Sequence, residues 1–153
     1  MPVLLRSEVK HPPVTLAWLK KTATVLLRHA DKKHCELSIL LVDDSRMTEL
    51  NATYRGISRP TNVLSFPMDD DPSSPARQLL GDIVISADTA AREALDSNRT
   101  LEDHLCALLV HGLVHLLGYD HERGEDDAAM MTAMEKELLL KLNEAKVLAP
   151  LAE

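Results

Sequence analysis

Short apolar segments alternate with amphipathic ones along the first half of the chain, and this alternation restricts the fold more than any other feature. The segments at about 3–8 and 35–42 have the length and composition of strands, and between them residues 14–29 carry apolar side chains at helical spacing. Two strands joined through a helix pair in parallel, by a right-handed crossover. The sequence therefore predicts a sheet with helices packed against it.

The later elements extend this sheet. They are expected in the following order: a helix at about 45–55, strands at 62–66 and 80–86, and helices at about 87–97, 101–117 and 126–146. The proline-broken, acidic segment at 68–77 (MDDDPSSPAR) is expected to be an exposed loop, so the strands on its two sides are predicted to be antiparallel. We predict an α+β (mixed α/β) fold: a small, mostly parallel sheet of about four strands with one antiparallel edge pairing, covered by about five to six helices.

Composition indicates one globular domain spanning residues 1–153. Hydrophobic residues make up 45% and charged residues 27% of the chain, and no repeat or low-complexity tract divides it. Cys35 and Cys106 lie far apart in apolar surroundings, as expected of reduced core thiols. The N-terminus lacks the pattern of a signal peptide, and no apolar run approaches the ~20 residues needed to cross a bilayer. A cytoplasmic protein without a membrane partner is predicted.

The net charge of -7 is unevenly distributed, with +4 over residues 1–60 and -11 over residues 61–153. An acidic chain is an unusual nucleic-acid-binding protein, but binding depends on the local field around a site. The histidines described next belong to the acidic half, whereas Arg55 and Arg59 belong to the basic half. We expect a cleft between the halves, with a basic wall that tracks phosphates opposite a metal ion.

Three histidines lie within the eleven residues HGLVHLLGYDH. His111 and His115 are four residues apart on a predicted helix, so both side chains project from one face. Gly118 can adopt the positive φ that ends a helix and reverses the chain, which would bring His121 towards the same point. Three imidazoles leave a fourth position open on a tetrahedral Zn²⁺, as in catalytic sites. One zinc ion per chain is predicted.

The spacing of these histidines equals that of the metzincin peptidases, H-E-x-x-H-x-x-G-x-x-H. In those enzymes the glutamate takes the proton from the zinc-bound water, but Gly112 stands at that position here. Glycine has no group that could act as a base. The chain is therefore expected to use its metal on a substrate other than a peptide.

The segment HGLVHLLGYDH resembles the signature of the bacterial YbeY endoribonuclease (rRNA maturation factor) family, and the resemblance extends to residues 51–67 and 80–86 in the same order and spacing. It implies a zinc-dependent, single-strand-specific endoribonuclease acting in small-subunit rRNA 3′-end maturation and in ribosome quality control. The implied partners are single-stranded RNA, rRNA, the small ribosomal subunit, a small-subunit ribosomal protein and a ribosome-associated GTPase, with no DNA. The resemblance also makes His111, His115 and His121 the zinc ligands.

Two further positions matter to this resemblance. Arg55 matches an arginine of functional importance in the family, and a guanidinium can hold a phosphodiester through two hydrogen bonds and stabilise its growing charge. Alternatively, Arg55 would be a surface residue whose positive charge the helix dipole favours at the C-terminus of a helix. Asn62 stands where the family usually has aspartate. Asparagine can replace a carboxylate that only anchors a strand, but not one that must be ionised.

Other candidates are weaker. Asp120 and Tyr119 precede the third histidine, so either could lie near the metal. The aspartate would orient an imidazole, handle a proton, or only bind turn amides. Ser65 could line the cleft, whereas Phe66 is more typical of a core. His104 lies on the helical face of His111, but with three ligands already assigned it is interpreted as a lining or hydrogen-bonded core histidine.

Three functional hypotheses follow from the sequence. The leading one is a metallo-endoribonuclease with Arg55 stabilising phosphate charge. The second is a metallopeptidase whose base comes from elsewhere, such as Asp120. The third is a non-catalytic ribosome assembly factor that zinc stabilises.

Overall fold

The computed structural model describes residues 3–32, 34–68, 79–118 and 125–145. Over these residues it contains four strands and five helices, which confirms the predicted fold class. Their bounds are β1 Val3–Ser7, α1 Leu16–His29, β2 Glu36–Val42, α2 Asp44–Arg55, β3 Val63–Pro67, β4 Leu79–Ser86, α3 Ala87–Asp96, α4 Leu101–Leu116 and α5 Glu125–Glu144.

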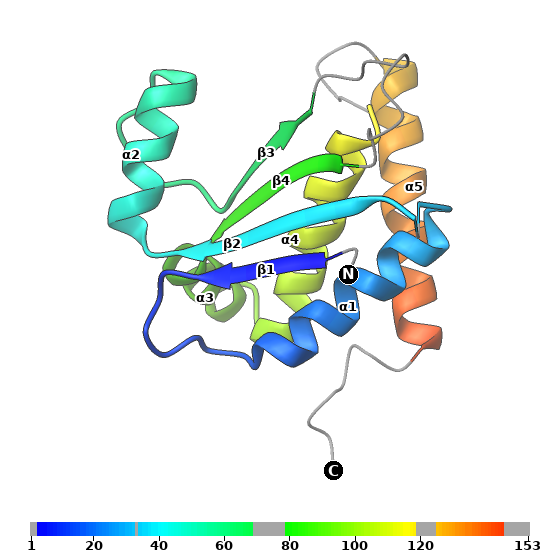
Figure 1. Ribbon diagram of the computed structural model, residues 1–153, viewed down its shortest axis with the longest axis horizontal. Helices are drawn as coiled ribbons and strands as arrows, with labels where there is room; N and C mark the ends of the chain where they lie inside the picture. The colour runs from blue at the N-terminus through cyan, green and yellow to red at the C-terminus, as the bar shows by residue number, and fades with distance from the viewer. Residues whose placement is uncertain (1–2, 33, 69–78, 119–124, 146–153) are drawn as a thin grey trace.

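The strands form one mixed sheet in the order β1-β2-β4-β3 (Figure 1). β1, β2 and β4 are parallel, with Leu37 of β2 opposite Gly81 of β4. β3 pairs antiparallel with β4, and Ser65 lies opposite Ile83. The predicted antiparallel edge pairing is therefore confirmed. The parallel strands β1 and β2 are joined through α1, whereas the chain passes through α2 and β3 between β2 and its parallel neighbour β4.

Alternate residues of the strands face two different layers. On one face Ile39 and Ile83 belong to a large apolar cluster that also contains Leu19 of α1, Leu109 of α4 and Leu138 of α5. On the other face a smaller cluster joins four residues: Val42, Met47, Leu64 and Val84. Figure 1 shows α4 and α5 side by side, whereas α2 stands apart at the other end of the sheet. α2 and α4 thus pack on opposite faces of the β3–β4 pair.

Helix α4 lies at the centre of the large cluster. Ten of its sixteen residues are buried, and apolar side chains occur on most of its sides, as expected of a helix enclosed by other elements. It contacts β3, β4, α3 and α5. Any side chain that leaves α4 towards solvent therefore has a rigid base, which is useful in a ligand site.

Both cysteines are buried and unpaired, as the sequence predicts. Burial raises the pKa of the Cys106 thiol to about 12, with smaller contributions from Asp103 and Glu102. Cys106 therefore stays protonated at neutral pH and is a packing residue of α4. Among the described residues, no helix is both long and apolar enough to cross a membrane.

Candidate metal centre

The ends of α4 are fixed by the residues that the sequence indicates. The Thr100 hydroxyl accepts a hydrogen bond from the Asp103 amide at 3.1 Å and caps the N-terminus. At the other end Gly118 has φ +103° and donates its amide hydrogen to the carbonyl of His115 at 3.0 Å. The left-handed glycine predicted at this position is confirmed.

His111 and His115 converge at the C-terminal end of α4. Their Nε2 atoms lie 3.2 Å apart, and the ring centroids lie 4.7 Å apart with planes at 84°. Two nitrogens held at about 2.0–2.1 Å from one tetrahedral zinc ion would be about 3.3 Å apart. Two nitrogen lone pairs at this separation repel unless a proton or a cation lies between them. The separation therefore fits a hydrogen bond between the two rings or a shared metal ion.

The carboxylate of Glu135 on α5 contacts the other side of the His111 ring. Glu135 Oε2 lies 2.6 Å from His111 Nδ1, and the two side chains are 26% and 38% exposed. An ionised carboxylate only accepts hydrogen bonds, so Nδ1 must carry the proton and donate it to Glu135. In a neutral ring this leaves the lone pair on Nε2, the atom that faces His115.

The third predicted ligand, His121, lies outside the described residues, as do Tyr119 and Asp120. Within the described ranges no group of three His, Cys, Asp or Glu side chains could together hold a metal ion. The structure therefore describes two of the three predicted ligands, and their Nε2 atoms are close enough to share an ion; the zinc site stays a prediction.

Gly112 lies on the side of α4 that packs against the sheet. A Cβ atom at this position would meet Ser65 Oγ at 3.1 Å and two carbons of Ile83 at 3.1 and 3.2 Å. Ser65 also donates its hydroxyl hydrogen to the carbonyl of Gly112 at 3.2 Å. A glutamate side chain at 112 would leave the helix in tight contact with these residues of β3 and β4. Gly112 is therefore a packing residue, and a larger side chain at this position would require Ser65 and Ile83 to shift.

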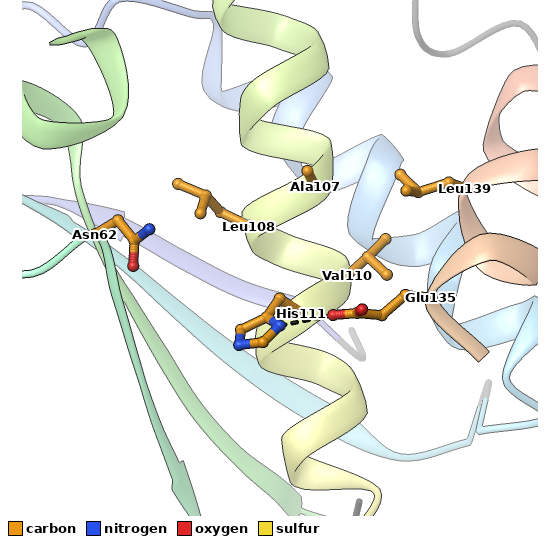
Figure 2. Close-up of a pocket in the computed structure, with 7 residues that line it drawn as sticks. All are labelled: Asn62, Ala107, Leu108, Val110, His111, Glu135 and Leu139. Atoms are coloured by element: carbon orange, nitrogen blue, oxygen red, sulfur yellow. Dashed lines mark hydrogen bonds and ion pairs between the residues drawn. The ribbon is translucent and has the colours of Figure 1, made fainter. Parts of the chain in front are cut away.

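A pocket of about 320 Å³ lies on the exposed side of α4. Figure 2 shows His111 at its centre, with Asn62 on one side and the α5 residues Glu135 and Leu139 on the other. Ala107, Leu108 and Val110 complete the described lining. None of these residues is Lys or Arg, so the basic wall expected opposite the metal is not formed by the described lining of this pocket.

Asn62 lines this pocket directly before β3. Its backbone carbonyl accepts from the amide of Ser86 at 3.0 Å, and its side-chain Nδ2 donates to Glu93 Oε1 of α3 at 3.1 Å. An aspartate at 62 would place a second carboxylate against Glu93. In this chain the amide therefore links the start of β3 to α3, which is an anchoring role.

His104 is held by two other side chains, two turns before His111. Its Nε2 lies 2.8 Å from Glu93 Oε1 and its Nδ1 lies 3.3 Å from a guanidinium nitrogen of Arg99. Because a guanidinium can only donate, Nδ1 is the acceptor and Nε2 carries the proton. Both ring nitrogens of this buried residue are thus used in a polar network with Glu93 and Asn62.

Arg55 is exposed in the last turn of α2, followed by Gly56 in a left-handed conformation that caps the helix. Its helix packs on the face of the β3–β4 pair opposite to α4. Arg55 is not among the residues that line the pocket. The structure therefore groups His111, His115, Asn62 and Ser65 around α4 and places the helix that carries Arg55 on the opposite face of the β3–β4 pair.

Sequence reasoning missed Glu135 and Glu93. Glu135 shares a helix face with the buried residues Met131, Leu138 and Leu142. A single carboxylate in an otherwise apolar stripe is the signal that could have identified it, because burying a charge is costly unless it is paired. The partner of that carboxylate depends on how α5 crosses α4, which the helical period does not reveal.

Comparisons with known proteins agree on one family. Residues 7–143 match the family model described as Endoribonuclease YbeY. A protein named Endoribonuclease YbeY from Persephonella marina is 38% identical over 136 residues, covering 89% of each chain. One of the same name from Syntrophotalea carbinolica is 42% identical over 142 residues, covering 92% of this chain and 95% of its own.

The fold also matches a solved structure. The solution structure of TM1509 from Thermotoga maritima has a TM-score of 0.67 and 26% sequence identity, covering 94% of this chain and 91% of that one. The α+β arrangement described above is thus also found in an experimentally determined relative.

Proposed function

Because the chain belongs to the YbeY endoribonuclease family, we propose that it is a zinc-dependent endoribonuclease that cleaves single-stranded RNA and acts in ribosomal RNA processing. Family membership itself supports a nuclease that hydrolyses RNA. The use of zinc, the preference for single strands and the ribosomal substrate belong to the proposal.

The convergence of His111 and His115 is the observation that carries the zinc requirement. Their Nε2 atoms lie 3.2 Å apart, and the Nδ1 of His111 is occupied by Glu135. We assign these two nitrogens, together with His121, as the ligands. When bound, zinc would lower the pKa of a water molecule to about 7 and so supply hydroxide at neutral pH.

The chain's own residues would bind and orient the substrate. Asn62 lies beside His111 in the lining of the pocket (Figure 2), where Glu93 holds its side-chain Nδ2. Ala107, Leu108 and Leu139 give the pocket an apolar lining that suits a nucleobase or ribose more than a phosphate. The phosphodiester would then need a cationic partner from outside the pocket.

Arg55 is our proposed partner for the phosphate. It is exposed at the end of α2, across the edge strand β3 from α4. An RNA strand that passes over β3, the edge strand of the described sheet, would extend from the pocket towards this guanidinium. Two parallel hydrogen bonds from Arg55 would neutralise charge on the phosphate.

The proposed biological substrate is the 3′ end of the small-subunit rRNA, with a further role in ribosome quality control. We propose the cytoplasm as the site of action. The proposed partners are the small ribosomal subunit, one of its proteins and a ribosome-associated GTPase. The resemblance of the sequence to the YbeY family is the support for these assignments.

Metal analysis combined with RNA cleavage tests the proposal. The purified protein is expected to contain about one zinc per chain and to cleave a single-stranded rRNA fragment, with a duplex of the same sequence as control. Chelator treatment, His111→Ala and Arg55→Glu should each reduce cleavage at least ~100-fold, the order of magnitude lost with one charge-stabilising group. Equal cleavage by Arg55→Glu and the parent chain would refute the proposed role of Arg55.

Two other outcomes identify the alternative hypotheses. Cleavage of casein but not RNA would indicate a metallopeptidase. Zinc binding that raises the melting temperature, without metal-dependent cleavage of either substrate, would indicate an assembly factor. Product ends then define the chemistry, since a 2′,3′-cyclic phosphate would exclude direct attack by water.

A further inference from the structure

We propose that Glu135 is the positioning residue of the metal site, because it holds the His111 ring with its proton on Nδ1 and its lone pair on Nε2. The inference rests on the proposed zinc site and adds α5 to it. Glu135 itself does not touch the metal in this assignment, since its carboxylate lies on the opposite side of the ring from the Nε2 pair.

The contact has the geometry of a strong hydrogen bond. The distance of 2.6 Å between Glu135 Oε2 and His111 Nδ1 is short for a nitrogen donor and a carboxylate acceptor. Glu135 is only 26% exposed, so water competes less for the carboxylate than it would at the surface. Figure 2 shows the carboxylate reaching from α5 to the ring in the wall of the pocket.

A neutral imidazole has two tautomers, and its ring can rotate about its bond to Cβ. Only the state with the proton on Nδ1 and with Nε2 directed at His115 can bind the shared ion. The carboxylate selects both the tautomer and the rotation, so less ordering remains to be done when the metal binds. Such partners of ligating histidines typically change metal affinity by 10–100-fold.

Packing alone does not account for a carboxylate at this position. Glu135 occupies the face of α5 that buries Met131 and Leu138 against the core, where a charged group is costly. Those apolar neighbours fix α5 against α1 and α4 and leave Glu135 aimed at the ring. The contact with His111 explains why a carboxylate occupies this position.

Zinc affinity of the full-length chain is the first test, measured by competition with a chelating indicator. Glu135→Ala should bind zinc 10–100-fold more weakly than the parent chain. Glu135→Gln should lose less, because its amide oxygen still accepts from Nδ1. Glu137→Ala is the matched control: Glu137 is an exposed carboxylate on the same helix, and its removal should leave the affinity unchanged.

The tautomer of His111 gives a second measurement that needs no metal. In nitrogen-15 NMR spectra of the metal-free protein, the parent chain and Glu137→Ala should show the His111 proton on Nδ1. Glu135→Ala should show it distributed over both nitrogens. Melting temperatures of the metal-free variants identify any loss of fold, and Glu135→Gln, which keeps the size of the side chain, covers the case in which Glu135→Ala unfolds.

Two results would overturn the inference. If Glu135→Ala, or Glu135→Gln should the alanine variant unfold, binds zinc like Glu137→Ala with an unchanged His111 tautomer, Glu135 is a structural residue only. The zinc site of the proposed function would then stand. If the parent chain itself binds no zinc, the inference and the proposed zinc requirement fail together.

Discussion

Helices α4 and α2 pack on the same two strands from opposite faces, but different interactions hold them. Ten residues of α4 are buried, nearly all of them apolar. In α2 only Met47 and Asn51 are buried. α4 carries the metal histidines and α2 carries Arg55, so different kinds of interaction hold the two parts of the proposed site in place.

Polar contacts hold α2 in place. Asp44 in its first turn accepts hydrogen bonds from Ser86 at 2.7 Å, Thr89 at 2.6 Å and Arg92 at 2.7 Å. Near the other end of the helix, Asn51 Nδ2 donates to the carbonyl of Arg59 at 2.8 Å and ties down the loop after Arg55. Apolar burial is non-directional and independent of pH, whereas contacts to a carboxylate depend on its charge. Acidic conditions should therefore weaken the contacts of α2, the helix that carries Arg55, while leaving the apolar packing of α4 intact.

The largest effect is expected from the core of α4. Leu109 is fully buried in the large apolar cluster, so Leu109→Ala should lower the free energy of unfolding by about 2–5 kcal/mol. Urea denaturation measures the change. Leu140→Ala removes a leucine that is 55% exposed and should shift stability by no more than about 0.5 kcal/mol. Similar losses in both variants would contradict the role assigned to α4.

The second effect concerns Asp44. Asp44→Ala leaves Ser86 and Thr89 without their shared acceptor and should cost about 1–3 kcal/mol in urea denaturation at neutral pH. Asp43 caps the same helix through the amide of Arg46, so Asp43→Asn, which keeps a capping oxygen, is the control that should change stability least. An Asp44→Ala variant as stable as this control would show that the polar contacts do not hold α2.

The Asp44 contribution should also depend on pH. Burial by itself would raise the pKa of this carboxyl, but hydrogen bonds from Thr89, Arg92 and Ser86 outweigh it and leave the pKa below its ordinary value. A carboxylate with a lowered folded-state pKa stabilises the protein above the unfolded pKa of about 3.9. That stability is lost as the pH falls below this value and through the lower, folded pKa. The stability difference between parent and Asp44→Ala should therefore shrink below about pH 4, and a constant difference would refute the linkage.

A smaller effect is expected at Asn62. Asn62→Asp replaces the donor to Glu93 with a second carboxylate, which should cost about 1 kcal/mol at neutral pH. Repulsion between the two carboxylates raises the pKa of the introduced one, so the loss should diminish as the pH falls towards 4–5 and one proton is taken up. Thermal melting is measured between neutral pH and pH 4 for Asn62→Asp and for the control Asn62→Leu, which has a side chain of similar shape. The comparison separates the effect of the added charge from the effect of losing the hydrogen bond to Glu93. A deficit independent of pH would argue against the anchoring role.

The smallest stability change is predicted for Arg55. Because the side chain is exposed, Arg55→Ala should change the free energy of unfolding by less than about 0.5 kcal/mol. Its effect should appear in RNA binding, where losing one phosphate contact reduces the slope of log affinity against log salt by about 0.7. Arg46→Ala, on the same helix, is the control. An unchanged slope would show that Arg55 does not contact phosphate.

The sequence predicts local features of this molecule well and contacts between distant elements poorly. Helical spacing placed His111 and His115 on one face, and Gly118 ends α4 as its freedom of φ predicts. The proline-broken segment correctly predicted the antiparallel pairing of β3. By contrast, the contact of His111 with Glu135 joins two helices, and its existence depends on their crossing. The position of Arg55 across β3 likewise follows from which face of the sheet α2 covers.

The strand order β1-β2-β4-β3 has a consequence for how the chain assembles. β4 follows β3 in the sequence yet lies between β3 and β2, so β3 has no neighbour in the sheet until residues 79–86 exist. During synthesis β3 cannot pair in this sheet, and α2 cannot make its contacts with β4, before β4 has been made. His111 and His115 are made later still, on α4, which packs against the paired strands β3 and β4. The histidines of α4 would thus reach their positions only after the strands beside the helix that carries Arg55 have paired.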